Sequence, residues 1–230
     1  MFDFLGALPP GIIMMLGALI IPFLPTKFQG WLALSLPVLS FGHLLGFFVD
    51  GDMVTSTIMG LEFNPVRVDR LSLIFGYIFH IAAFLAGLYA LKVEDGIQHL
   101  SGMVYAGAAI AAVFAGDLIS LFVFWELTAI SSVFLIWASR NEDSLRCGVR
   151  YLIIQVSSGV ILLAGAMLHY SETGSLAFDG FVDGNGMLST ASTVILWAFG
   201  IKAAFPFLHN WLQDSYPKAT YSGTVFLSAF

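Results

Sequence analysis

Charged residues and cysteine are both scarce in this sequence of 230 residues. Asp, Glu, Lys and Arg together make up 10% of it, whereas a typical soluble domain has about 25%. The single cysteine, Cys147, excludes an internal disulfide and offers no metal-ligand spacing. The sequence has no cysteine cluster, flavin motif or haem-type ligand pair, so we expect no bound cofactor. Its loops carry no basic or aromatic cluster of the kind that binds nucleic acid.

Apolar stretches take the place of charge. Hydrophobic residues make up 58% of the chain, and the mean hydropathy is +0.89. Runs close to the roughly 20 apolar residues that cross a bilayer recur along the whole length, whereas an outer-membrane barrel would show alternating segments of about 10 residues. Residues 1–26 lack the basic start of a removable signal peptide and resemble a first membrane helix. The sequence therefore predicts an all-α, polytopic transmembrane helical bundle in the lipid bilayer of a cell or inner membrane.

Seven membrane spans and the start of an eighth are expected. The seven spans cover approximately residues 6–25, 30–49, 71–91, 98–116, 117–138, 148–170 and 189–213. The eighth begins near Gly223, and residues 223–230 are too few to cross about 30 Å of hydrocarbon at about 1.5 Å per residue. We therefore expect the sequence to belong to a longer protein or to work beside a separate C-terminal half.

Basic residues in the short loops predict the orientation, because cytoplasmic loops carry an excess of Lys and Arg. If the N-terminus lies outside, only Arg67 and Arg70 fall on the outer side, within an external loop at 50–70. A second external loop then covers residues 171–188. Six basic residues fall on the inner side: Lys27, Lys92, Arg140, Arg146, Arg150 and Lys218. The sequence thus predicts a periplasmic or extracellular N-terminus.

Two ionisable residues of opposite sign interrupt predicted spans. Glu126 lies within DLISLFVFWELTAISSVFLIWA (117–138), and Lys202 lies within LSTASTVILWAFGIKAAFPFLHNWL (188–212). A charged side chain at the bilayer centre costs about 2.5–3.5 kcal/mol on insertion scales, so such residues usually have a function. Two opposite charges predict a path for protons or ions. The structural alternatives are a hydrogen-bonded Glu126 carboxyl and a static ion pair with Lys202.

Proline and histidine residues extend this hypothesis. Pro206 follows Lys202 by four residues and should break the helix, because proline removes a backbone donor and clashes with the carbonyl four residues back. Transporters place ion sites at such broken helices. His209 and His80 are candidate relay groups, since imidazole titrates near neutral pH, with a hydrogen-bonded structural histidine as the alternative. Asp117 is expected to cap a helix. Several polar residues could hold water or bridge helices: Ser131, Ser132, Gln155, Ser157, Ser158 and Thr193.

Three stretches of the sequence together resemble the antiporter-like membrane subunits. They are VDRLSLIF (68–75), GDLISLFVFWELTAISSVFLIWASR (116–140) and GIKAAFPFLHNWLQDSYPKATYSGTVFLSAF (200–230). This family is shared by respiratory complex I, membrane-bound hydrogenases and the multisubunit Mrp Na⁺/H⁺ antiporters. Within the family, SGTVFLSAF (222–230) is most similar to the D-type member of Mrp antiporters. The resemblance covers nearly the whole chain.

The resemblance implies a site and an architecture. Glu126 matches the fifth-helix glutamate and Lys202 the seventh-helix lysine of the family's proton pathway. Family members have about fourteen helices, including two inverted repeats that each contain a broken helix. By this resemblance, residues 1–92 form three leading helices. Residues 93–230 form most of the first repeat and stop before the eighth-helix Lys or His that would continue the relay.

The function implied by the resemblance is that of a transport subunit. It would conduct protons through the Glu126–Lys202 pair within a multisubunit antiporter for a monovalent cation, Na⁺ in Mrp, and its partners would be other membrane subunits. One alternative is a proton-pumping membrane subunit of an NADH:quinone oxidoreductase or a hydrogenase-like complex, in which the redox chemistry belongs to other chains. Another is an inactive subunit that serves assembly.

Overall fold

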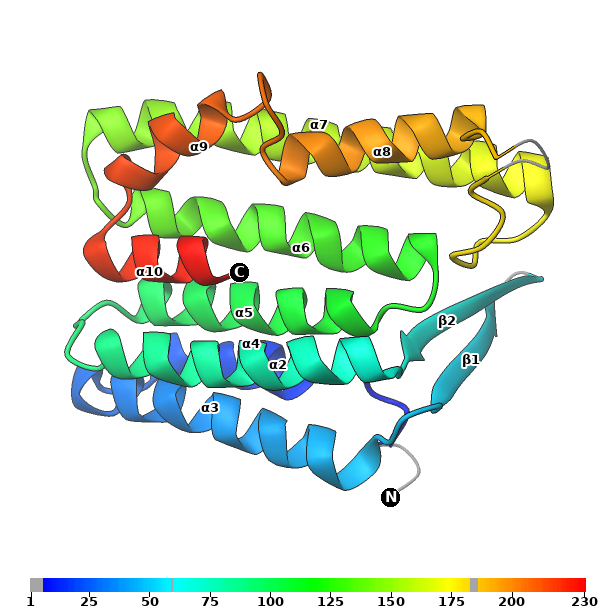
Figure 1. Ribbon diagram of the computed structural model, residues 1–230. Helices are drawn as coiled ribbons and strands as arrows, with labels where there is room; N and C mark the ends of the chain where they lie inside the picture. Colours follow the sequence, from blue (N-terminus) through cyan, green and yellow to red (C-terminus); the bar gives the residue numbers. More distant parts are fainter. Residues whose placement is uncertain (1–5, 59, 183–185) are drawn as a thin grey trace.

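The computed structural model describes residues 6–58, 60–182 and 186–230. Most of its helices lie side by side along one direction, and a β-hairpin projects from one end of the bundle (Figure 1). The elements in chain order are α2 (Ile12–Ala18), η1 (Ile21–Phe23), α3 (Thr26–Phe47), β1 (Met53–Ile58), β2 (Leu61–Arg67), α4 (Arg70–Tyr89), α5 (Gly96–Phe114), α6 (Leu118–Trp137), α7 (Glu142–Thr173), α8 (Thr190–Lys202), α9 (Asn210–Ser215), η2 (Tyr216–Lys218) and α10 (Tyr221–Ala229).

Five helices within the described residues are long and apolar enough to cross a membrane, namely α3, α4, α5, α6 and α7. They correspond to the second to sixth predicted spans, which confirms the all-α prediction. The first and seventh predicted spans are shorter apolar helices, Ile12–Phe23 and Thr190–Lys202. Residues 221–229 form α10, where the eighth span was expected to begin.

The first span is short because glycine and prolines interrupt it. Gly11 precedes α2 with a φ of 92°, a left-handed conformation that glycine adopts without strain. A Cβ at this position would also overlap the carbonyl oxygen of Gly107 on α5. After α2, Pro22 lies within η1, and Pro25 precedes α3. The close contact with α5 therefore replaces a continuous membrane helix at this point.

Short polar side chains define where the other helices begin. The side chains of Asp69, Asp95, Asp117, Asn141, Ser189 and Thr220 each accept hydrogen bonds from backbone N–H groups in the first turn that follows. Asp117 is therefore a helix cap, as predicted. At Asp69, the hydrogen bond from the backbone of Ser72 lowers the pKa of the carboxyl group below its usual range. Asn141 starts α7 several residues earlier than the sequence indicated.

A two-stranded antiparallel hairpin occupies the loop predicted at 50–70. Strand β1 pairs with β2 from Met53 opposite Arg67 to Ile58 opposite Leu61. The buried Asp117 carboxylate joins this hairpin to the bundle, because its Oδ2 accepts the backbone N–H of Asn64 at 2.7 Å. The backbone N–H of Gly116 donates to the carbonyl of Asn64 at 2.8 Å. The hairpin is therefore fixed to the turn between α5 and α6.

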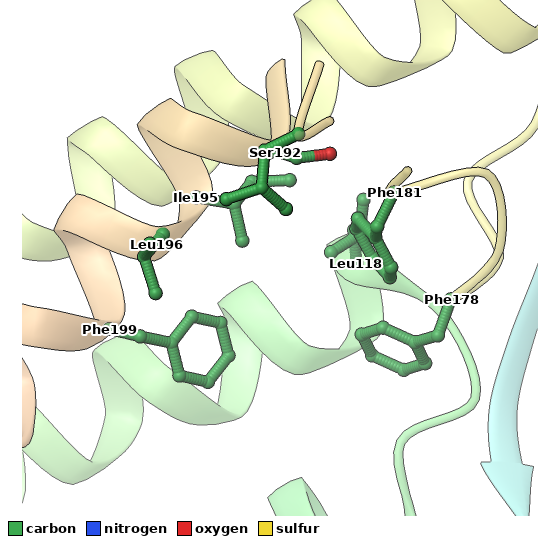
Figure 2. A pocket seen from close by; sticks show the side chains of 8 residues that line it. Leu118, Phe178, Phe181, Ser192, Ile195, Leu196 and Phe199 are labelled. Atoms are coloured by element: carbon green, nitrogen blue, oxygen red, sulfur yellow. The ribbon is translucent and has the colours of Figure 1, made fainter. Parts of the chain in front are cut away.

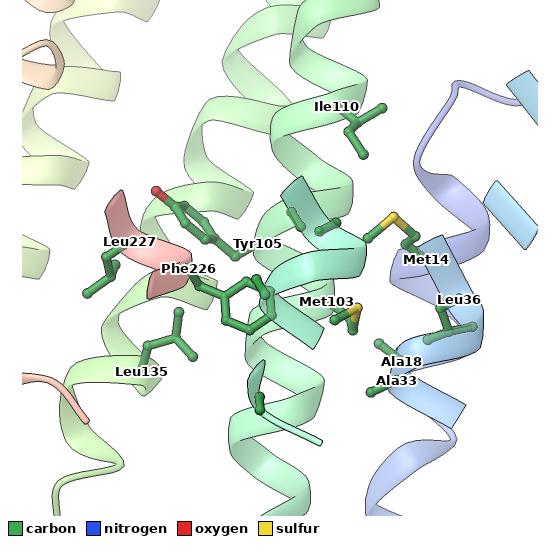
Figure 3. Packing of buried hydrophobic residues seen from close by; sticks show 14 of the residues in the cluster. Met14, Ala18, Ala33, Leu36, Met103, Tyr105, Ile110, Leu135, Phe226 and Leu227 are labelled. Atoms are coloured by element: carbon green, nitrogen blue, oxygen red, sulfur yellow. The ribbon is translucent and has the colours of Figure 1, made fainter. Parts of the chain in front are cut away.

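Helix α5 lies at the centre of the bundle and packs against α2, α3, α4, α6 and α10. Its sequence is rich in glycine and alanine, and it is the most buried of the long helices. Figure 3 shows Met103 and Ile110 near Met14 and Leu36 of the N-terminal helices, and Tyr105 near Phe226 of α10. Small residues let helices approach closely, which matters in lipid because burial of apolar surface gives little drive there.

Ion pairs gather at the end of the bundle opposite the hairpin (Figure 1). The guanidinium of Arg140 lies 2.8 Å from Asp95, and the ammonium of Lys218 lies 3.5 Å from Asp143. The hydroxyl of Ser139 donates to the carbonyl of Lys218 at 2.7 Å. The basic residues assigned to the inner side around 140–150 and 218 thus share one end. Which side of the membrane this end faces stays a prediction.

Candidate functional site

The predicted break near Pro206 is present. Helix α8 ends at Lys202, and α9 begins only at Asn210. Pro206 has no N–H to continue the helical hydrogen bonds, and the chain turns instead through positive φ angles at Ala204 (54°) and Phe207 (71°). Such angles are uncommon outside glycine. The break puts Lys202 at a helix end, with its side chain free of a following helical turn.

Trp211 folds the segment after the break back onto α8. Its indole Nε1 donates to the carbonyl of Ile201 at 3.0 Å, which satisfies a carbonyl in the last turn of α8. The indole is buried, and its ring centroid lies 5.5 Å from that of Tyr151 on α7. Sequence reasoning did not single out Trp211. A Trp shortly after a proline break, where an indole can reach back to free carbonyls, was the available signal.

Lys202 is partly buried and binds helix α6. Its ammonium Nζ donates to the hydroxyl of Thr128 at 2.9 Å and to the carbonyl of Trp125 at 3.2 Å. It also lies 4.9 Å from the centroid of the Trp125 ring, within the range of a cation–π contact. The Thr128 hydroxyl in turn donates to the same Trp125 carbonyl at 2.7 Å. Thr128 thus accepts from Lys202 and donates to Trp125, a role that sequence reasoning missed.

Glu126 lies on α6 between Trp125 and Thr128, the residues that bind Lys202. No ion pair joins Glu126 to Lys202 within 4.0 Å in the part of the chain that the structure describes. The Glu126 Oε1 atom is buried and has no hydrogen-bond partner among the described residues. Its carboxylate lies against Gly159 of α7. The site therefore contains an acid and a base close in space that are not paired with each other.

A row of polar groups joins α6 to α7 beside this pair. The indole Nε1 of Trp125 donates to the Ser158 hydroxyl at 3.2 Å, and this hydroxyl donates to the carbonyl of Gln155 at 2.6 Å. Nearer the C-terminal end of α6, the hydroxyls of Ser132 and Tyr151 lie 2.8 Å apart. These contacts place Gln155 at the level of α6 between Trp125 and Ser132. The Gln155 amide is buried and lacks a hydrogen-bond partner within the described ranges.

Apolar side chains close the opposite direction, toward the hairpin. Leu118, Leu121, Leu162, Ala166 and Ile195 form a buried cluster at the N-terminal half of α6, together with Trp125 and Ala198. The polar groups around Glu126 therefore continue only toward the C-terminal end of α6, within the described residues.

A cavity of about 300 Å³ lies beside this apolar cluster. Figure 2 shows that the side chains from α8 and those of Phe178 and Phe181 line it together with Leu118. Ser192 is the one polar residue in the lining. Phe199 lies between this cavity and the site, because its ring contacts that of Trp125 at a centroid distance of 4.9 Å. The cavity has no charged lining residue and does not suit an ion.

The two predicted histidines lie elsewhere. His80 is buried between α4 and α3: its Nδ1 bonds the carbonyl of Gly76 at 2.7 Å, and its Nε2 bonds the hydroxyl of Ser40 at 2.9 Å. Because a carbonyl only accepts, Nδ1 carries the hydrogen. His209 is partly buried at the start of α9, and its side chain caps no backbone group. The structure brings together Glu126 and Lys202, and the relay roles of His80 and His209 stay predictions.

Comparison with known proteins gives the class first. Residues 115–230 match the family described as "NADH:quinone oxidoreductase/Mrp antiporter, TM". This match covers half of the chain and includes Glu126, Lys202 and the break after α8. The chain belongs to this family of antiporter-like membrane subunits.

Particular relatives follow from its sequence. The A-type Na⁺/H⁺ antiporter subunit of Alkalihalophilus pseudofirmus is 30% identical over 230 residues, which cover 88% of this chain and 28% of the relative. The A1-type Na⁺/H⁺ antiporter subunit of Staphylococcus aureus is 28% identical over 235 residues, with 91% and 29% covered. The chain thus spans less than a third of the length of these relatives. The predicted family is confirmed, and these relatives are named as A-type members, whereas residues 222–230 by themselves resemble the D-type member.

Two solved structures share the fold. The Mrp complex from Dietzia sp. DQ12-45-1b matches with a TM-score of 0.79 at 23% identity, over 95% of this chain and 26% of that chain. The membrane-bound sulfane sulfur reductase, an archaeal respiratory membrane complex, matches with a TM-score of 0.77 at 21% identity, over 95% and 49%. One is an antiporter-type complex and the other a respiratory complex, so the fold itself serves both.

Proposed function

We propose that this chain is the proton-conducting part of a membrane subunit in a multisubunit monovalent cation/proton antiporter, with Glu126 and Lys202 as the groups that exchange protons. The observation that carries the proposal is the position of Lys202. At the end of a broken helix, its ammonium binds the two residues that flank Glu126, Trp125 and Thr128, without pairing with Glu126 itself. The purely structural alternative of a static ion pair finds no support in this arrangement.

The long lysine side chain gives the site two arrangements. In one, the ammonium binds Thr128 and the Trp125 carbonyl; in the other, it moves to the adjacent carboxylate of Glu126. In a medium of low dielectric constant, the free energy of a carboxylate depends strongly on whether a cation is near. A change in the distance between Glu126 and Lys202 therefore changes whether Glu126 holds a proton. Movement of the lysine head group is thereby coupled to proton transfer.

The polar groups beside the site supply one route for the proton. Ser158, Gln155, Ser132 and Tyr151 run from the level of Glu126 toward the C-terminal end of α6, and the apolar cluster occupies the other direction. Basic residues gather at the same end, and by the positive-inside rule this end faces the cytoplasm. In this proposal the N-terminus is periplasmic or extracellular, and Glu126 exchanges protons with the cytoplasmic side.

The cation and the partners are proposed from the relatives. The A-type relatives that this chain resembles are named Na⁺/H⁺ antiporter subunits, so Na⁺ is the proposed cation. The Dietzia structure is that of a complex, and this chain covers about a quarter of the chain it matches there. Other membrane subunits are therefore the proposed partners.

Replacement of Glu126 tests the function. Glu126→Gln keeps the size and hydrogen-bonding capacity of the side chain but removes the titrating carboxyl. We expect it to abolish Na⁺-driven proton movement, measured by a fluorescent pH probe in everted vesicles that hold the chain in its native complex. Glu62→Gln, the same exchange at an exposed position of β2, serves as the control and should transport normally. Full transport by Glu126→Gln, with normal amounts of protein, would refute the relay.

The redox-driven alternative is supported by the fold shared with the archaeal respiratory complex. The same vesicles distinguish the two. An antiporter moves protons in response to a Na⁺ gradient without an electron donor, whereas a redox-driven pump requires electron transfer through other subunits. Proton movement that depends on an added donor and not on Na⁺ would support the respiratory function.

A further inference from the structure

Gly159 lies in the interior of α7, where glycine is unfavourable. It is buried and sits near the middle of a helix of 32 residues. Glycine in a helix interior costs about 0.5–1 kcal/mol relative to alanine, because it loses more backbone freedom on folding. A glycine at such a position needs a reason in the packing.

The carboxylate of Glu126 fills the space that a side chain at position 159 would occupy. A Cβ on Gly159 would overlap the Oε1 atom of Glu126 and lie 2.7 Å from its Cδ and 3.4 Å from its Cγ. These three atoms are the nearest to that Cβ, so the space serves Glu126 alone. The lack of a side chain at 159 is what lets the carboxylate lie against α7.

Helix α7 cannot simply move away to admit a larger residue. The Trp125 indole bonds the Ser158 hydroxyl at 3.2 Å directly beside Gly159, and the Ser132–Tyr151 bond at 2.8 Å joins the two helices further along. Gly148 makes room in the same way for the indole of Trp137, since a Cβ there would overlap that ring. These contacts set the distance between α6 and α7. A methyl group at 159 would therefore displace the Glu126 side chain rather than the helix.

We propose that Gly159 is a positioning residue for Glu126: by leaving room on α7, it holds the carboxylate beside α7, apart from the Lys202 ammonium that Thr128 and Trp125 bind. The inference rests on the proposed proton relay. An alanine at this position forces the carboxylate into another rotamer and changes its separation from Lys202. Misplacement of a reacting group by about 1 Å can lower a rate about 100-fold.

Gly165 offers a matched control in the same helix. A Cβ at Gly165 would lie 2.6 Å from Cγ1 of Ile195 on α8, so Gly165→Ala crowds an apolar contact without touching Glu126. A Cβ at Gly42 on α3 would meet no atom within 4 Å, and Gly42→Ala should change nothing. The two controls separate general crowding of α7 from displacement of the carboxylate.

A double-mutant cycle with Glu126→Asp gives the decisive comparison. Aspartate is one methylene shorter, so its carboxyl carbon takes the place of the glutamate Cγ, which lies in ordinary contact with a Cβ at 159. We expect Gly159→Ala to lower Na⁺-driven proton movement by about 10- to 100-fold. Glu126→Asp should partly restore transport in Gly159→Ala, by about fivefold or more, and should not restore Gly165→Ala. Wild-type transport in Gly159→Ala, or equal rescue of both alanine variants, would overturn the proposal.

Chemical labelling supplies a readout that does not depend on transport. A hydrophobic carbodiimide modifies protonated carboxyl groups in membranes, and mass spectrometry of the purified complex gives the extent of labelling at Glu126 against pH. The midpoint should move by about one pH unit in Gly159→Ala and stay in place in Gly165→Ala. An unchanged midpoint with an inactive Glu126→Gln would refute the role of Gly159 alone. A shifted midpoint with an active Glu126→Gln would instead refute the relay.

Discussion

The hydroxyl of Thr128 lies 2.9 Å from the ammonium of Lys202, across the contact between α6 and α8. Thr128 follows Glu126 by two residues, so the proposed proton acceptor and the group that holds the lysine belong to the same turn of α6. The same hydroxyl donates to the Trp125 carbonyl, which also accepts from Lys202 at 3.2 Å. The lysine therefore has a defined binding position that competes with Glu126 for its charge.

Replacement of Thr128 should disturb this competition. Thr128→Val keeps the shape of the side chain but removes the hydroxyl, and loss of a hydrogen bond to a charged group costs about 1.5–3 kcal/mol. We expect transport to fall by about tenfold or more, while Thr128→Ser retains most of it. Rates of Na⁺-driven proton movement in everted vesicles, normalised to the amount of protein, check this. Equal rates in the valine and serine variants would show that the hydroxyl plays no part.

Lysine and arginine at position 202 should behave differently. Arginine keeps its charge at every accessible pH and cannot give up its proton, whereas lysine can exchange one. We expect Lys202→Ala to be inactive and Lys202→Arg to be strongly impaired in the same vesicle assay. Full transport by Lys202→Arg would mean that position 202 supplies a fixed charge only.

Loss of Asp117 should loosen the hairpin and destabilise α6. Its carboxylate accepts from the backbone N–H groups of Ile119, Ser120 and Asn64 and from the Ser120 hydroxyl. Asp117→Ala removes all four bonds and should lower the free energy of unfolding by about 2 kcal/mol or more. Thermal unfolding in detergent measures the change, with Asp52→Ala, a residue before β1, for comparison. Protease cleavage within residues 53–67 should become faster; unchanged cleavage would contradict the anchoring role.

Asp69 predicts a loss of stability in acid. Its folded-state pKa is lowered, first by the hydrogen bond from the Ser72 backbone. The stabilisation is thus fully present above the unfolded-state pKa, about 3.9, and is lost as the pH falls through the lower folded-state value. Asp69→Asn keeps a good cap without the charge. It should unfold with a weaker dependence on pH below about 4 than the parent protein does, and identical curves would contradict the assignment.

The sequence predicted the parts of this protein that depend on local composition. Five membrane helices, the helix cap at Asp117 and the break near Pro206 each follow from apolar length, a short polar side chain or a missing N–H. Glu126 and Lys202 stood out because charges are rare in membrane spans. That their side chains approach the same turn of α6 also agrees with the family resemblance.

The partners of these residues were not predictable from the sequence. Thr128, Ser158 and Trp211 look like ordinary polar or aromatic residues of membrane helices, and their roles arise only when α6, α7 and α8 pack together. The hairpin was missed because its strands are short and lie in a loop between two far stronger apolar signals. His80 satisfies both ring nitrogens through Ser40 and Gly76, a pairing of α3 with α4 that no spacing in the sequence indicates.

Helix α7 gives the site one rigid wall and leaves the other hinged. Its 32 residues extend to about 48 Å at about 1.5 Å per residue, well beyond the roughly 30 Å hydrocarbon layer. The neighbouring α8 stops after 13 residues, at Lys202. Any rotation at the break therefore carries the lysine along a helix that stays straight, so the carboxylate side serves as a fixed reference against which the moving charge is positioned.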